Sequence, residues 1–207
     1  MGDFKILVEG VADIQFIKQY VKHILDIDLI QKNHIDKTGG WTNISSLSQE
    51  GEAIRIEMQR NKDNGKKNII IFDADTNYVQ RRDEINSWKS KFNLEFELFL
   101  FPNNLNSGTL EDLLENIINP VNNPIFDCWD SYEKCLRTKS ISGRSYPLTT
   151  PAKKTKIYGY LEALLGPSHS EKQKIKEIYR DYLNTDYWNL DTNYLTPLKD
   201  FLTTYTK

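Results

Sequence analysis

The sequence predicts an α/β fold with about four mostly parallel strands, followed by an all-helical C-terminal extension. Two observations support this prediction. Over roughly the first hundred residues, short apolar runs alternate with segments of helical period, which is the pattern of βαβ units. After Pro102 only segments of helical period remain. The chain has 207 residues, of which 39% are hydrophobic and 27% charged, an ordinary composition for a globular protein.

The first half of the chain supplies the predicted strands. Ile14, Ile17 and Val21 recur at helical spacing and predict the first helix. Asn43 is suitable as the N-cap of the second helix, and Asn64-Gly65 interrupts the pattern that follows it. We expect strands at 4–8, 33–37 (weak), 68–72 and 95–101, and helices at 11–25, 43–60 and 79–92.

The second half is predicted to contain helices only. Thr109-Leu-Glu-Asp112 has the form of a capping box, with Asp in place of the usual Glu. The loop 139–152 contains Gly143, Pro147 and Pro151 and is the segment most expected to be mobile. The predicted helices are 110–118, 125–138, 153–165, 171–183 and 195–205. We expect an α/β domain at 1–115 and a helical extension at 116–207, packed on it as one structural unit.

Composition excludes several classes of protein. The apolar runs are strand-sized, so we expect no membrane span. Met1-Gly2 is followed closely by the first predicted strand, so we also expect no secretory signal. Cys128 and Cys135 lie seven residues apart on a predicted helix, about 10 Å at 1.5 Å per residue, which is too far to bridge. We expect both to be reduced core residues of a cytoplasmic protein.

Charge is divided unevenly along the chain. From Lys134 to Arg180 there are eleven Lys and Arg against three Asp and Glu, a net charge of +8, so the remainder carries −10 within a total of −2. The acidic part could hold metal while the basic part holds a polyanion, although such runs are often only solvated helix faces. Tyrosines within the basic part could stack on unpaired bases or pack between helices: Tyr146, Tyr158, Tyr160 and Tyr179.

The apolar run 68–72 ends in two carboxylates, Asp73 and Asp75. On a strand, side chains two residues apart point to the same side. Open α/β sheets bind ligands at the carboxyl ends of their strands. Two like charges this close are unfavourable without a cation, and Mg²⁺ prefers carboxylate oxygens. The alternative is that the pair forms a turn or a helix cap.

A parallel sheet would bring further carboxylates to the same edge. Glu9 follows the first strand, Asp13 lies one helical turn later, and Glu111 and Asp112 follow the fourth strand. Each alone could be a strand-end residue or an acid favoured by a helix N-terminus. Together they would suit two metal ions better than one.

Two segments resemble the signature motifs of the TOPRIM domain: Val8-Glu-Gly-Val-Ala-Asp13 and Ile71-Phe-Asp-Ala-Asp75. That domain occurs in topoisomerases, bacterial primases, ribosomal-RNA maturases and OLD-family nucleases. Asp13 and the stretch Gly108-Thr-Leu-Glu111 are most similar to the OLD-type, two-metal branch. The whole chain also resembles short TOPRIM-like bacterial proteins, in which segments like 102–114 and 195–202 recur.

The resemblance implies a Rossmann-like fold and a Mg²⁺- or Mn²⁺-dependent phosphodiester hydrolysis or nucleotidyl transfer on nucleic acid. Glu9 would be a general acid/base or a metal ligand. Asp73 and Asp75 would hold metal, and Asp13 and Glu111 would complete a second metal site.

OLD-type enzymes also use a Lys from beyond the sheet to stabilise charge on the phosphate. Lys153, Lys154 and Lys156 are candidates, and we choose Lys154. Arg144, Lys153 and Lys156 are expected to contact nucleic acid. OLD proteins carry a fused ATPase, whereas this chain has no Gly-x-x-x-x-Gly-Lys-Ser/Thr loop. A protein partner could therefore supply specificity.

Other classes fit less well. Haloacid-dehalogenase-type phosphatases need Thr or Val where Asn77 stands, and nothing besides Asp-x-Asp supports a sugar-nucleotide transferase. His23, His34 and His169 do not form a zinc ligand set with the two cysteines, and no Gly-x-Ser-x-Gly elbow is present. The main alternative is a non-catalytic, metal-stabilised module whose basic helical part binds nucleic acid or a protein.

Overall fold

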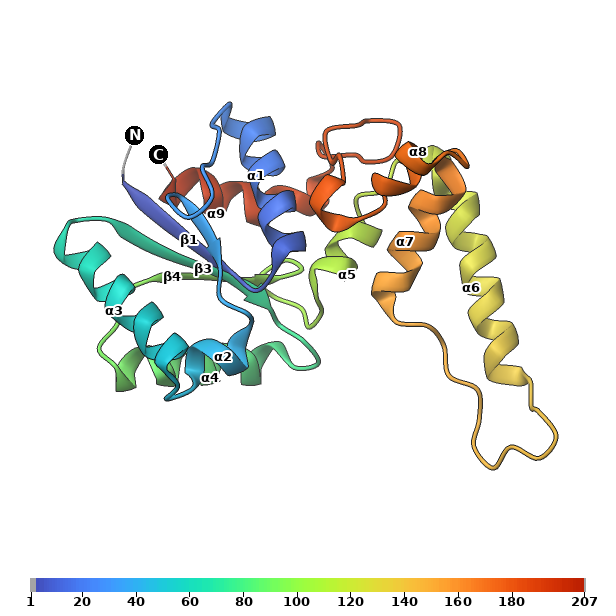
Figure 1. The fold of residues 1–207 in the computed structure, drawn as a ribbon, viewed down its shortest axis with the longest axis horizontal. Coiled ribbons are helices and arrows are strands. Elements are labelled where there is room, and N and C mark those ends of the chain that lie inside the picture. The colour runs from blue at the N-terminus through green and yellow to red at the C-terminus, as the bar shows by residue number, and fades with distance from the viewer. Residues whose placement is uncertain (1–2, 207) are drawn as a thin grey trace.

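The computed structural model describes residues 3–206, and a four-stranded, all-parallel sheet lies at its centre (Figure 1). The predicted α/β class is confirmed. The strand order is β2-β1-β3-β4, so the chain leaves β1 in one direction and later returns to its other side. The crevice beyond the carboxyl ends of β1 and β3 is therefore a topological switch point, where such sheets bind ligands. The strands are β1 Phe4–Val8, β2 Ile35–Lys37, β3 Lys67–Asp73 and β4 Glu97–Phe101.

Helices cover both faces of the sheet. Alternate residues of β3 enter different cores: Ile69 and Ile71 pack with α1 and α9, whereas Ile70 and Phe72 pack with α3 and α4. Because both faces are buried, the central strand β3 has apolar residues from Ile69 to Phe72 without alternation. The helices of this half are α1 Val11–Leu25, α2 Trp41–Ser45, α3 Gln49–Asp63, α4 Tyr78–Lys91 and α5 Leu110–Glu115.

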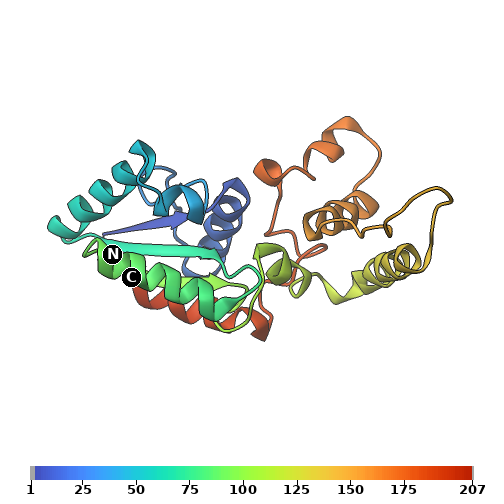
Figure 2. The same ribbon diagram turned by 90° about the horizontal axis from the view of Figure 1, so that it is seen from below.

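The remaining helices divide between an arm and the sheet. Helices α6 and α7 lie side by side and project away from the sheet layers; we call residues 123–164 the α6–α7 arm (Figures 1 and 2). Helix α9 returns to the sheet, where the rings of Phe201 and Phe99 of β4 lie 5.3 Å apart. The elements are η1 Pro120–Asn122, α6 Asn123–Thr138, α7 Lys153–Leu164, α8 His169–Gln173, η2 Glu177–Tyr179, η3 Asn193–Leu195 and α9 Thr196–Tyr205.

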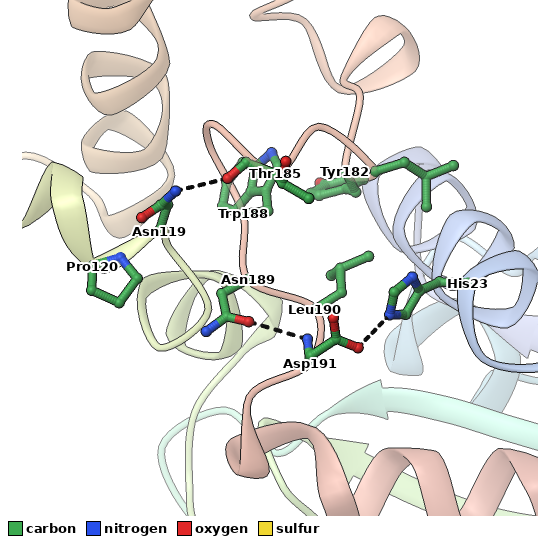
Figure 3. Close-up of a pocket in the computed structure, with 10 residues that line it drawn as sticks. His23, Asn119, Pro120, Tyr182, Thr185, Trp188, Asn189, Leu190 and Asp191 are labelled. Carbon is green, nitrogen blue, oxygen red and sulfur yellow. Dashed lines mark hydrogen bonds and ion pairs between the residues drawn. The ribbon is translucent and has the colours of Figure 1, made fainter.

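A cavity of about 300 Å³ lies where the segment before α9 joins α1 and the start of the helical part (Figure 3). His23 Nε2 and Asp191 Oδ1 are 2.8 Å apart. Asn119 Nδ2 donates to the Thr185 carbonyl at 2.8 Å. Asn189 Oδ1 accepts from the backbone N–H of Asp191 at 3.2 Å. Because these polar groups pair with one another, we interpret the contacts around this cavity as structural. They connect the helical part of the chain to α1.

The predicted helix 171–183 is wrong beyond its first turn. Only α8 and the single turn η2 form there. The side chain of Gln19 in α1 forms hydrogen bonds with the backbone of this segment. It donates to the Arg180 carbonyl at 2.8 Å and accepts from the Tyr182 N–H at 2.6 Å. The buried Arg180 guanidinium donates to the Ile175 carbonyl at 3.1 Å. These tertiary hydrogen bonds replace helical ones, which sequence periodicity does not reveal.

Two other predicted helices differ in their bounds. The helix 43–60 is two helices, because Ser48 begins α3 as its N-cap and accepts from Gly51 N–H at 3.2 Å. The helix 110–118 ends at Glu115, because the chain beyond it pairs with another segment: Asn189 N–H donates to the Ile117 carbonyl at 2.6 Å.

The expectation that Cys128 and Cys135 are core residues is wrong, since both are free and exposed. Helix α6 packs along α7 but contains no fully buried residue, because the arm leaves its other sides in solvent. Within residues 3–206, no helix is long and apolar enough to cross a membrane. The expected absence of a leader involves Met1 and Gly2, which lie outside the described residues.

Candidate functional site

A second cavity, also of about 300 Å³, opens at the carboxyl edge of the sheet, at the switch point between β1 and β3. It brings together residues from six separate parts of the chain. Four of the predicted metal ligands and the chosen lysine line it, together with one acid that was not predicted. Its charged residues are Glu9, Asp13, Asp73, Glu111, Lys154 and Glu177.

Glu9 joins the ends of the two central strands. Its Oε1 accepts from the backbone N–H of Asp73 at 3.2 Å, and its backbone carbonyl accepts from Gly39 N–H at 3.0 Å. Gly40 has a φ of +94°, and a Cβ there would lie 3.2 Å from Glu9 Oε2, so a glycine leaves room for the carboxylate. Burial raises the pKa of Glu9, while the Asp73 N–H opposes the change.

Asp73 and Asp13 lie close enough to Glu9 for its charge to raise the pKa values of both. Asp73 Oδ1 accepts from Leu110 N–H at 2.9 Å, which ties β3 to the start of α5. Burial, together with the charges of Asp13 and Glu9, raises the pKa of Asp73 to about 9. Asp13 is only 6% exposed, and burial with the charge of Glu9 raises its pKa to about 7, against the effect of the Gly10 N–H. Negative charge is therefore crowded at this edge.

Helix α5 begins at the predicted capping box, which is confirmed. Asp112 Oδ2 accepts from Thr109 N–H at 2.7 Å. Glu111 Oε2 accepts from Thr109 Oγ1 at 2.9 Å, and Glu111 lines the cavity. Asp112 instead forms an ion pair with Lys153. The two neighbouring acids thus have different surroundings.

Asp75 lies at the rim rather than in the wall. Its φ of +52° is left-handed, so the strand alternation expected to align it with Asp73 ends before it. Its exposed carboxylate pairs with Arg81 of α4. It is still near enough for its charge to raise the pKa of Glu9.

Among the candidate lysines, only Lys154 reaches the cavity, where it pairs with Glu177. Lys153 pairs with Asp112. Lys156 contacts Glu115 at 3.1 Å and Asp130 of α6 at 2.9 Å. Arg144 lies outside this region, in the loop between α6 and α7, with its guanidinium over the ring of Tyr146.

Sequence reasoning missed Glu177 and Arg81. Glu177 was placed within a long predicted helix, and only the tertiary path of that segment brings it to the cavity. Arg81 lies in the first turn of α4, six residues after Asp75. A basic residue soon after an Asp-x-Asp pair is the one local signal that could have indicated it.

The donor chemistry fits a hard divalent cation. The cavity offers carboxylate oxygens, and the pKa values of Asp13 and Asp73 are raised by burial and by the charges of neighbouring acids, both of which a cation would offset. Each of the four carboxylates already accepts a hydrogen bond from a backbone N–H or a hydroxyl group. Across residues 3–206, no three His, Cys, Asp or Glu side chains already stand in the arrangement of a metal site. Small side-chain rotations would therefore accompany binding.

These features define an α/β protein with a parallel sheet and an acidic cavity at its switch point. The chain belongs to the family described as "Protein of unknown function (DUF3226)", whose model matches residues 3–207. No curated protein and no solved structure matches the chain.

Proposed function

We propose that this protein is a cytoplasmic, Mg²⁺-dependent phosphodiester hydrolase or nucleotidyl-transfer protein that acts on nucleic acid through a TOPRIM-like site. One observation carries the proposal: Glu9, Asp13, Asp73 and Glu111 converge on one cavity at the switch point, with Lys154 on its wall. The TOPRIM resemblance of the motifs around Glu9 and Asp73 supports the same reaction class.

The residues divide the work of such a reaction. Asp73, Asp13, Glu9 and Glu111 would hold Mg²⁺ or Mn²⁺, two ions in all, which would supply charge stabilisation and an activated water. Lys154 would neutralise charge on the phosphate, after leaving Glu177. Burial raises the pKa of Glu9, which makes it a better proton acceptor than an ordinary surface glutamate.

The test is cleavage of single- and double-stranded DNA and RNA in Mg²⁺ or Mn²⁺. We expect Glu9→Ala and Asp73→Ala each to lower the rate by about 100-fold or more, since each removes a charged group from the reaction centre. Glu52→Ala is the matched control, because Glu52 is an exposed acid in the first turn of α3. Cleavage that survives both cavity substitutions would contradict the proposal.

A specific observation favours the non-catalytic alternative. Two charges of the motifs are neutralised internally, Asp75 by Arg81 and Lys154 by Glu177. In a binding module these pairs would persist, and metal would serve stability alone. Metal binding without cleavage of any of the four substrates would select this alternative.

A further inference from the structure

The loop between α6 and α7 presents an unusual surface. Every residue from 139 to 147 is exposed, and the chain contains no acidic residue from 134 to 161. A loop of this length without secondary structure is typical of binding segments. It lies on the projecting α6–α7 arm, away from the sheet layers (Figure 2).

Within the acid-free stretch 134–161, the cations without an acidic partner lie in this loop and at the adjoining end of α6. In the acid-free stretch, four basic residues form ion pairs: Arg137, Lys153, Lys154 and Lys156. Within residues 3–206, Lys134, Lys139 and Arg144 form none. The lysines of α7 are therefore engaged with the protein, whereas the cations of the loop and of the adjoining end of α6 are available to an anion.

Arg144 and Tyr146 form a preassembled pair on the loop. The guanidinium carbon of Arg144 lies 4.1 Å from the ring centroid of Tyr146, and its Nε donates to the Tyr146 carbonyl at 3.2 Å. Gly143, with a φ of +82°, makes the turn before them. Tyr146 is 63% exposed. An aromatic ring with a fixed cation is thus held in solvent rather than in a core, a combination that suits stacking on a base beside its phosphate.

We propose that the loop 139–147 binds single-stranded nucleic acid, with Tyr146 stacked on an unpaired base and with Arg144, Lys139 and Lys134 on the backbone phosphates. This rests on the proposed action on nucleic acid and assigns its substrate class. A duplex hides the faces of its bases, so a stacking ring selects strands or ends whose bases are unpaired.

The loop also leads directly to the acidic cavity. Lys154 lies eight positions after Tyr146, a path of at most about 28 Å when fully extended. Lys153 fixes the end of that path against α5 through its ion pair with Asp112. Grooves for single strands commonly cover roughly 4–16 nucleotides, so a strand held at Tyr146 can reach the cavity.

Fluorescence anisotropy with labelled oligonucleotides of about 12 nucleotides tests this inference, in EDTA so that nothing is cleaved. The probes are single-stranded DNA, single-stranded RNA and a DNA duplex of the same sequence. We expect Tyr146→Ala to weaken single-strand binding by about tenfold, and Tyr146→Phe to leave it unchanged, because stacking needs the ring and not the hydroxyl. Tyr205→Ala, at a partly exposed tyrosine at the end of α9 and outside the basic part, should bind as the wild type does.

The phosphate contact is tested through the salt dependence of affinity. Each phosphate contact on a single strand contributes about 0.7 to the slope of log affinity against log salt. Arg144→Ala should reduce the slope by about that amount. Arg60→Ala, at an exposed arginine on α3, on the opposite side of the molecule from the arm, should not (Figure 1).

The outcomes separate this inference from the proposed function. Unchanged binding in Tyr146→Ala, or duplex binding as tight as single-strand binding, would overturn the role of the loop even if Asp73-dependent cleavage is found. Weakened single-strand binding in Tyr146→Ala with no cleavage of any substrate would uphold the loop and remove the hydrolase. The DNA and RNA probes show which strand the loop prefers.

Discussion

The acidic sheet edge and the basic α6–α7 arm differ in how their charged side chains are accommodated. At the edge, like charges are buried together, and the pKa values of Asp13 and Asp73 rise as a result. On the arm, cations are either paired with acids or exposed to solvent. The edge therefore contains an unfavourable interaction that a bound cation would relieve, whereas the arm contains none. We expect the edge to respond to metal and the arm to respond to salt.

Metal should produce the largest effect on stability. At a Mg²⁺ concentration of 100 times its Kd, binding stabilises a native protein by about 2.7 kcal/mol, which for about 200 residues raises Tm by about 5–10 °C. Differential scanning calorimetry with and without Mg²⁺ measures this. Asp73→Ala should abolish the shift, and Lys139→Ala on the arm should keep it. An equal shift in Asp73→Ala would place the metal elsewhere.

Replacing Asp73 by Asn should stabilise the metal-free protein. Asparagine keeps an acceptor for the Leu110 N–H and is neutral at every pH, whereas Asp73, with a native pKa of about 9, must take up a proton on folding at pH 7. We expect a gain of about 1–3 kcal/mol in the free energy of unfolding at pH 7, measured by urea denaturation in EDTA.

This gain should depend on pH in a defined direction. The native pKa of Asp73, about 9, lies above the ordinary value of about 3.9, so the native state holds this proton more tightly than the unfolded state. Stability from this group is present below pH 4 and is lost as the pH rises towards 9. The advantage of Asp73→Asn should therefore grow over that range. If the stability gained by Asp73→Asn does not change with pH, the raised pKa of Asp73 and the crowding of charge at the sheet edge are contradicted.

The two neighbouring lysines at the start of α7 should have unequal effects on cleavage. Each pairs with one acid, but only Lys154 lines the cavity. In the cleavage assay, Lys154→Ala should lower the rate by about 10- to 100-fold and Lys153→Ala by less than about threefold. The reverse order would mean that Lys153 leaves Asp112 to take the place assigned to Lys154.

The sheet was predictable where local pattern and burial agree. Strands 4–8 and 68–72 are buried on both faces, so apart from Lys5 and Asn68 their residues are apolar. The helix expected at 171–183 failed because Gln19, far away in sequence, takes its backbone hydrogen bonds. Cys128 is exposed, contrary to the prediction, because the α6–α7 arm projects away from the core.

The candidate site shows the same limit. Residues that directly follow strands, such as Glu9 and Asp73, could be placed from the sequence because the topology of a parallel sheet brings strand ends together. Asp75 does not line the cavity as predicted, because its backbone is left-handed and the strand pattern does not indicate this. Glu177 reaches the cavity only through the tertiary path of an irregular segment, for which the sequence carries no signal.

Helix α9 has a consequence for how the chain folds. Its Leu198 and Leu202 complete the core over β4, where Phe99 and Phe101 lie roughly a hundred residues earlier in the chain, a separation that favours slow folding. During synthesis, that aromatic strand emerges from the ribosome well before its cover exists. We therefore expect the nascent chain to expose an apolar surface over this interval, when aggregation is favoured.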